Sequence, residues 1–178
     1  MNIQIRKGTK EDARGAVEVN TTSWQSTYKN LLPIEVLINR VKTMDDRTIK
    51  LQKTILEEDN LYVAVDNNKI IGMMTYGPSR NEEYKDSGEI YAIYLLDEYH
   101  GNHIGKRLFM TGIKELINKG YNSMILNVLE GNKTIDFYKK YQGVEVGKIT
   151  DNLGSTNINE LIMYFDNLNN IYEEVNNE

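Results

Sequence analysis

The stretch GEIYAIYLLDEYHGNHIGKRLF, Gly88 to Phe109, carries most of the information in the sequence about the fold. Its first part, Glu89–Leu96, is mostly apolar, which is typical of a buried strand. A polar loop with glycines follows, and apolar residues then recur at helical spacing until Gly120 ends the helix. Ser123–Leu129 is a second apolar strand. This strand–loop–helix–strand order predicts that the two strands run parallel.

The flanking segments add antiparallel strands and further helices. The turn Asn67-Asn68, two residues of a type that tolerates positive φ, predicts a hairpin. A capping box of Thr9 and Asp12 predicts the start of the first helix. The expected elements are a strand at 3–6, helices at 9–24, after Pro33 and at 47–57, strands at 61–65 and 69–76, a helix at 132–141, and strands at 145–149 and 160–165. The sequence therefore predicts an α/β fold, with a mixed sheet flanked by helices.

The composition excludes several classes of protein. A length of 178 residues fits one domain, and a net charge of −5 argues against a nucleic-acid-binding protein. The absence of cysteine rules out disulfides, a cysteine nucleophile and thiolate zinc sites, and it is compatible with a reducing cytosol. No apolar run is long enough to cross a membrane, and the N-terminus lacks a signal sequence. We expect a soluble, cytoplasmic protein that acts without nucleic acid or membrane; a homodimer is compatible with the sequence.

The loop with Gly101 and Gly105 is the first candidate binding site. Backbone N–H groups of a glycine loop that opens a helix converge on one point, and the helix dipole adds positive charge there. Such a loop binds phosphate or pyrophosphate, and Lys106 and Arg107 would supplement it. The alternative is a plain strand–helix connection whose glycines only permit a tight turn. The usual nucleotide-binding glycine motifs are absent from the sequence.

This loop resembles motif A of the GNAT superfamily of acyl-CoA-dependent N-acyltransferases, Gln/Arg-x-x-Gly-x-Gly/Ala. In register, His100 stands at the Gln/Arg position, His103 at the middle glycine and Gly105 at the last. Two of these three positions depart from the motif. The histidine at 103 adds a Cβ where backbone must approach phosphate, and it makes a positive φ costly.

Two other segments strengthen the resemblance, which extends over residues 3 to 166. LNVLEGNKTIDFYKKYQGVEVGK (Leu126–Lys148) is similar to motif B, Asn-x-x-Ala-x-x-Phe-Tyr, with Ile135 at the alanine position. The matching residues are Asn132, Phe137, Tyr138 and Gly143. TSWQSTYKNLLP (Thr22–Pro33) is similar to a Trp-x-x-x-Tyr…Pro segment of the branch that acetylates polyamines and other small amines.

The resemblance implies the acyl-CoA N-acyltransferase fold. In that fold the central sheet is mostly antiparallel, two parallel strands splay apart, and helices flank the sheet. We expect residues 1–166 to form this domain, and residues 167–178, rich in Asn and Glu, to be a polar C-terminal tail that frays.

The resemblance also implies a site for acetyl-CoA as acyl donor. The backbone of Ile93 and Leu95 would pair with the pantetheine arm, which lies between the splayed strands. Asn132 would hydrogen-bond the same arm, and it could equally cap the helix that follows. The residues expected to hold the pyrophosphate are His100, Gly101, Asn102, His103, Ile104, Gly105 and Lys106.

Tyr138 and Glu89 are the candidate catalytic residues. The resemblance places the Tyr138 hydroxyl beside the cofactor sulfur, where a phenol can protonate the departing thiolate; otherwise Tyr138 is a core residue. Glu89 stands where some protein-acetylating members carry a base, and by alternation it shares a side with Tyr91 and Ile93. It would accept a proton from the amine directly or through water, or orient the amine, or only end a strand. A backbone N–H near Leu95 would stabilise the oxyanion.

Trp24 and Tyr28 are the candidate substrate-binding residues. They stand four apart on one helix face, and the resemblance places this region against the acceptor pocket. Packing of the helix on the sheet is the alternative role for both aromatic rings. His100 and His103, with Asp97 and Glu98, lack the spacing of a metal site, and we expect no metal.

The sequence thus favours an N-acetyltransferase that moves an acetyl group from acetyl-CoA to a primary amine of a small molecule by direct attack in a ternary complex. A polyamine would suit the acidic balance of the chain. The alternative acceptor is a protein N-terminus or lysine. The alternative of another class is a non-catalytic acyl-CoA-binding regulatory module.

Overall fold

The computed structural model describes residues 2–176 as a mixed α/β protein. Its seven-stranded sheet has the order β1-β2-β3-β4-β5-β7-β6. β4 and β5 pair in parallel and β2 and β3 are antiparallel, as the sequence predicts. The structure adds the antiparallel pairs β1–β2, β5–β7 and β6–β7. The chain divides into two compact units, Met1–Thr75 with Ala92–Thr111 and Tyr76–Tyr91 with Gly112–Glu178. No described helix is long and apolar enough to span a membrane.

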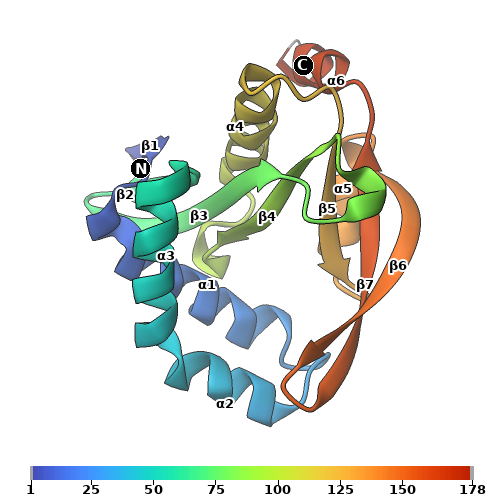
Figure 1. Ribbon diagram of the computed structural model, residues 1–178. Coiled ribbons are helices and arrows are strands. Elements are labelled where there is room, and N and C mark those ends of the chain that lie inside the picture. The colour runs from blue at the N-terminus through green and yellow to red at the C-terminus, as the bar shows by residue number, and fades with distance from the viewer. Residues whose placement is uncertain (1, 177–178) are drawn as a thin grey trace. The chain divides into compact units, whose positions relative to one another are not determined.

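The first unit joins the N-terminal strands to three helices (Figure 1). Its elements are β1 (Ile3–Lys7), η1 (Lys10–Asp12), α1 (Ala13–Thr27), α2 (Ile34–Lys42), α3 (Met44–Glu58), β2 (Leu61–Asp66), most of β3 (Lys69–Pro78), the second half of β4 (Gly88–Leu95), η3 (Asp97–Tyr99) and the first turns of α4 (Ile104–Asn118). The β2–β3 turn has φ values of 47° at Asn67 and 68° at Asn68, so the predicted hairpin is confirmed. Asparagine tolerates this left-handed conformation better than most residues, which explains the choice of residue.

The core of the first unit forms where α1 and α3 pack on the strands. Small residues on α1 permit this close approach, because a Cβ at Gly15 would lie 2.8 Å from Ile70 Cδ1. The buried members of the core are Ala13, Ala16, Val19, Ile55, Leu61, Val63 and Met73. α1 therefore has one face fixed against the sheet, and this anchoring positions the side chains at its C-terminal end.

The second unit consists of a long hairpin with helices. Its elements are the end of β3, η2 (Glu82–Tyr84), the first half of β4, the rest of α4, β5 (Met124–Leu129), α5 (Thr134–Lys140), β6 (Val144–Leu153), β7 (Thr156–Phe165) and α6 (Leu168–Asn176). β6 and β7 pair from Val144↔Tyr164 to Leu153↔Thr156, so the hairpin extends well beyond the strands predicted from apolar residues. Its added part is polar and mostly exposed, and so carries no apolar pattern.

The expectation that the C-terminal segment frays is wrong for residues 168–176. These residues form α6, in which Leu168 and Ile171 are fully buried and Val175 is 8% exposed. The spacing of these three residues follows one helix face, a pattern that the surrounding Asn and Glu residues obscured.

Candidate active site

The glycine loop lies between β4 and α4 in the first unit. His100 Nε2 lies 3.2 Å from the carbonyl oxygen of Leu95, which links the start of the loop to the end of the strand. α4 begins at Ile104, earlier than the sequence suggested, and its first backbone bond runs from Arg107 N to His103 O at 3.0 Å. Because an α-helix leaves its first N–H groups without intrahelical acceptors, the end of the loop presents donors to an anion.

His103 adopts the backbone conformation that a glycine would favour. Its φ is 57°, in the left-handed region, and Gly101 has a φ of 79°. The position aligned with the middle glycine of motif A therefore does require positive φ, and the histidine adopts it at an energetic cost. A Cβ at Gly101 or Gly105 would meet nothing within 4 Å. The loop surface is thus open enough for a pyrophosphate to approach the backbone, and these residues fit the donor that the sequence predicts.

The residues expected to face the pantetheine arm lie on the same unit. Ile93 and Leu95 are in the second half of β4, and both are partly exposed. The Leu95 carbonyl also accepts a hydrogen bond from Ser23 Oγ at 3.2 Å, which ties β4 to α1. In the second unit the pairing of β4 with β5 is confined to Gly88↔Met124 and Glu89↔Ile125. Parallel pairing that stops after two residues is consistent with the splay that the resemblance implies.

Trp24 of α1 and Tyr28, which caps the C-terminal end of that helix, do lie side by side. Their ring centroids are 4.9 Å apart in an edge-on arrangement, and Tyr28 is buried. Trp24 Nε1 donates to the Tyr94 hydroxyl of β4 at 2.9 Å. The guanidinium of Arg40, from α2, stacks on the Trp24 ring with its Cζ 4.0 Å from the centroid. Trp24 thus packs α1 on the sheet. It also contacts a polar cluster that consists of Asn20, Arg40, Arg47 and Tyr94.

Two arginines in this cluster were not identified by the sequence analysis. Arg40 donates from Nε and Nη2 to Asn20 Oδ1, at 3.2 and 2.6 Å. Arg47 donates to the same oxygen from Nη1 at 2.9 Å, and to the Thr21 hydroxyl. No motif marks these residues, because the contacts depend on how three consecutive helices, α1, α2 and α3, pack on one another.

Glu89 is buried in the second unit and is ion-paired. It is 2% exposed, and its Oε1 accepts from Nε and Nη2 of Arg80. Its Oε2 accepts from the Arg80 backbone N–H at 2.8 Å. Arg80 also stacks over Tyr91 at 4.2 Å, which confirms that Glu89 and Tyr91 share a side of β4. Burial acts to lower the pKa of Arg80, but hydrogen bonding to Glu89 and its charge outweigh burial, and the pKa is raised.

Glu160, on β7, is a second carboxylate that interacts electrostatically with Arg80 and Glu89. Burial raises the pKa of Glu160, and the charges of Asp151 and Glu89 raise it further, while Arg80 opposes them. The sequence analysis identified Glu89 but missed Arg80 and Glu160. Arg80 lies just after β3, Glu89 on β4 and Glu160 on β7, so only the folded structure brings these three residues into one electrostatic group.

Asn132 and Tyr138 lie at the start and in the middle of the α5 region. Asn132 is 7% exposed and its Oδ1 accepts from Thr134 N at 2.9 Å, so its capping role is observed. Tyr138 is also 7% exposed, and its ring packs edge-on against Phe165 with centroids 6.4 Å apart. Both residues therefore have structural contacts, which leave their proposed roles in catalysis and binding open to test.

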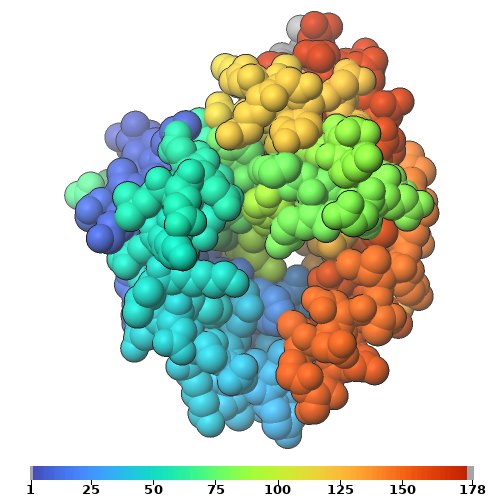
Figure 2. Space-filling view, in the orientation of Figure 1, coloured from blue at the N-terminus to red at the C-terminus, as the bar shows by residue number. Residues whose placement is uncertain are grey.

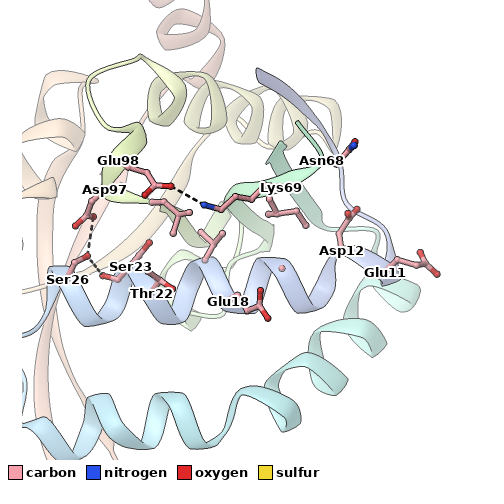
Figure 3. Close-up of a pocket in the computed structure, with 14 residues that line it drawn as sticks. Glu11, Asp12, Glu18, Thr22, Ser23, Ser26, Asn68, Lys69, Asp97 and Glu98 are labelled. Atoms are coloured by element: carbon pink, nitrogen blue, oxygen red, sulfur yellow. Dashed lines mark hydrogen bonds and ion pairs between the residues drawn. The ribbon is translucent and has the colours of Figure 1, made fainter. Parts of the chain in front are cut away.

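The first unit also contains an acidic cavity of about 640 Å³ between α1 and the β2–β3 turn (Figure 3). Three of its carboxylates pair with cations: Asp12 with Arg6, Glu18 with Arg14, and Glu98 with Lys69, the last at 3.0 Å. Asp97 accepts from Ser26 Oγ at 3.1 Å. Because three of the carboxylates are already paired with cations, the cavity attracts a further cation less than its composition suggests. Among residues 2–176, no group of three or more His, Asp or Glu side chains is placed to hold a metal ion.

Residues 24–144 match the model of the acetyltransferase (GNAT) family. The chain belongs to this family. Over 161 residues it is 30% identical to the uncharacterized N-acetyltransferase YuaI of Bacillus subtilis, covering 89% of this chain and 90% of that protein. It is 28% identical over 145 residues to a spermidine N(1)-acetyltransferase of Thermoplasma acidophilum, covering 79% of this chain and 87% of that protein.

A solved GNAT structure shares the fold. The PaiA N-acetyltransferase of Thermoplasma acidophilum, crystallised with coenzyme A, has a TM-score of 0.72 and 22% identity, with 93% of this chain and 99% of that chain covered. The protein is therefore a GNAT N-acetyltransferase, an acyltransferase that uses acetyl-CoA. The fold and the donor predicted from the sequence are confirmed.

Proposed function

We propose that this enzyme transfers the acetyl group to a primary amine of a small molecule by direct attack in a ternary complex. The observation that carries the proposal is the Trp24–Tyr28 pair, which the structure holds at 4.9 Å in the segment similar to small-amine acetyltransferases. The similarity to a spermidine acetyltransferase supports the same substrate class. The sequence contains no cysteine, so the chain offers no thiol for an acyl-cysteine intermediate.

Tyr138 is the proposed general acid. Acetyl-CoA supplies the acetyl group as a thioester, whose leaving sulfur needs a proton. Tyr138 Oη donates this proton, and the backbone N–H near Leu95 stabilises the oxyanion. The support for Tyr138 is its match to motif B and its fixed ring, which Phe165 and Phe137 hold edge-on.

Glu89 is the proposed acceptor of the amine proton. An alkyl ammonium with a pKa of about 10 must lose a proton before it attacks. Arg80 donates two hydrogen bonds to Oε1 of Glu89 and one to Oε2, so Oε2 keeps a lone pair that can take a proton. This pairing favours transfer through a water molecule over direct contact with the amine.

An amine screen with acetyl-CoA tests the proposal. Release of the coenzyme A thiol is followed with a panel of monoamines, polyamines, amino acids and a lysine peptide. Turnover of small amines above that of the peptide is the expected result. A clear preference for the peptide would move the substrate to proteins, and acetyl-CoA binding without any turnover would identify a regulatory module.

The Tyr138→Phe variant tests the general acid. We expect kcat to fall about 100-fold with little change in acetyl-CoA affinity, because general acids contribute 10²–10⁴-fold. Tyr141→Phe is the matched control, because it removes the hydroxyl of another tyrosine, the one that caps the C-terminal end of α5. An unchanged kcat in Tyr138→Phe, with chemistry rate-limiting, would remove Tyr138 from this role.

The Glu89→Gln variant tests the proton acceptor. We expect its rate loss to be largest at low pH, where the free amine is scarce. Glu130→Gln, which removes an exposed carboxylate paired with Lys148, is the control. An equal loss at every pH would show that Glu89 only positions the amine.

A further inference from the structure

Arg40 and Arg47 form a cationic pair without a carboxylate partner in the described part of the chain. The two guanidinium groups share one neutral acceptor, Asn20 Oδ1. Arg47 has two further acceptors, the Thr21 hydroxyl and the Arg40 carbonyl, the latter at 2.7 Å. A structural arginine of this kind normally faces an acid, and here none of the acceptors is charged.

The pair is electrostatically unbalanced. Burial, together with the positive charge of Arg40, lowers the pKa of Arg47 to about 10. Burial also lowers the pKa of Arg40. Each cation loses hydration, and the two repel each other across the amide of Asn20. An anion close to the pair would relieve both effects.

The hydrogen-bonding capacity of the pair is incompletely used. Arg47 Nε is buried and has no acceptor among residues 2–176. Arg40 uses Nε and Nη2 on Asn20, while its planar face lies on Trp24. Its other terminal nitrogen, Nη1, makes no hydrogen bond within the described residues, and this nitrogen is the available donor of a fixed guanidinium fork.

The position of the pair connects it to the acceptor amine. Trp24 lies under Arg40 and bonds to Tyr94, the β4 residue between Ile93 and Leu95. Trp24 and Tyr28 are the residues proposed above to line the acceptor pocket. Helices α2 and α3, which bring the two arginines to α1, form the light-blue to teal surface in Figure 2.

We propose that the acceptor amine carries an anionic group, a carboxylate or a phosphate, and that Arg40 binds it, with Arg47 adding positive potential. This inference rests on the proposed function and narrows its substrate class. It argues against polyamines, because a second ammonium group near two guanidinium groups would be repelled. The enzyme would therefore differ in specificity from the spermidine acetyltransferase to which it is similar.

A matched series of amines tests the inference in the wild-type enzyme. 4-Aminobutanoate, butylamine and 1,4-diaminobutane have four-carbon chains that end in a negative, a neutral and a positive group. We expect kcat/KM to fall in that order. 2-Aminoethyl phosphate and β-alanine then separate phosphate from carboxylate as the preferred anion. A preference for 1,4-diaminobutane, or equal use of the three amines, would overturn the inference while leaving the proposed function intact.

The Arg40→Gln variant assigns the effect to a residue. We expect about a 30-fold loss of kcat/KM for the preferred anionic amine, mainly through KM, and less than about a threefold change for butylamine, as expected when a charge-assisted hydrogen bond is lost. Arg40→Lys should restore part of the loss. Arg14→Gln, which removes an exposed arginine of α1 paired with Glu18, is the control.

The remaining outcomes are distinct. An equal loss for butylamine and the anionic amine would show that Arg40 only holds the helices together, and would overturn the inference. If Arg40→Gln does not fold, the ranking in the wild-type enzyme decides alone. Absence of turnover with every amine would instead overturn the proposed function, and the inference with it.

Discussion

His103 shows how one residue can conflict with the backbone that it occupies. A left-handed conformation costs an ordinary residue about 1–2 kcal/mol, and glycine avoids most of this cost. The φ of 57° at His103 therefore stores strain at the end of the loop expected to hold the pyrophosphate. His103 thus departs from motif A in its side chain only. Its backbone has the positive φ that a glycine at this position would adopt readily.

The His103→Gly variant should be more stable than the wild type. We expect the free energy of unfolding to rise by about 0.5 kcal/mol, since relief of strain exceeds the added entropy of the unfolded chain. Urea unfolding measures the change. Gly101→Ala, at a φ of 79° with open space around it, should cost about 1 kcal/mol and calibrates the backbone effect. A less stable His103→Gly variant would indicate that the imidazole makes favourable contacts.

Glu160 gives a prediction for pH. Its pKa is raised in the folded state, mainly by burial, so the unfolded chain loses this proton first as the pH rises. Glu160 therefore lowers stability above its unfolded pKa of about 4.5. The Glu160→Gln variant should be more stable at neutral pH, and this gain should shrink as the pH falls through the raised pKa of the folded state and be absent below about 4.5. Thermal melting across pH measures it; a gain that does not depend on pH would contradict the assignment.

The residues that sequence alone could identify are those in local motifs. Asn132 and Tyr138 belong to one short pattern, and Trp24 and Tyr28 to another. Arg80 and Arg40 could not be found in this way. Arg80 contacts Glu89, and Arg40 contacts Asn20, only because the chain is folded. The residues next to these arginines in the sequence do not distinguish them from arginines exposed to solvent.

At the scale of elements, Gly143 sets how α5 joins the sheet. A Cβ at this position would lie 2.7 Å from Phe165 Cζ and 2.8 Å from the Tyr138 carbonyl oxygen. The glycine of motif B is thus required by a close contact between the end of α5 and β7. The sequence showed the glycine, but only the packing shows why no larger residue fits.

The Gly143→Ala variant should therefore destabilise the protein by about 2 kcal/mol, the usual cost of an overpacked site. Because Tyr138 is on α5, kcat should also fall. Gly147→Ala is the control, since its Cβ would meet Ile162 at an ordinary 3.5 Å. Chemical unfolding and the amine assay measure the two effects. Equal stability of the two variants would show that α5 can shift without cost.

The elements were predicted well where burial is one-sided. β4, β5 and α4 have continuous apolar faces, and the structure forms them close to the expected bounds. The polar end of the β6–β7 hairpin was missed because it is formed by backbone hydrogen bonds, which residues of almost any type can make. α6 was missed because its three buried residues are separated by Asn and Glu.

At the scale of the molecule, β3, β4 and α4 each contribute residues to both compact units. Disruption of one unit therefore breaks elements that the other unit needs. The sequence predicted a single domain from its length, but it could not show that the contacts gather into two groups. That division depends on contacts between residues far apart in the chain.

The polar cluster around Trp24 has a further consequence for measurement. This residue is the single tryptophan of the chain, and it lies in the first unit between a guanidinium and a phenol. Its fluorescence therefore reports on the first unit alone, whereas circular dichroism averages over both. Since three elements are shared, the two signals should change at the same urea concentration. A fluorescence transition that precedes the circular dichroism transition would mean that the first unit unfolds by itself, with an optical probe already in place to follow it.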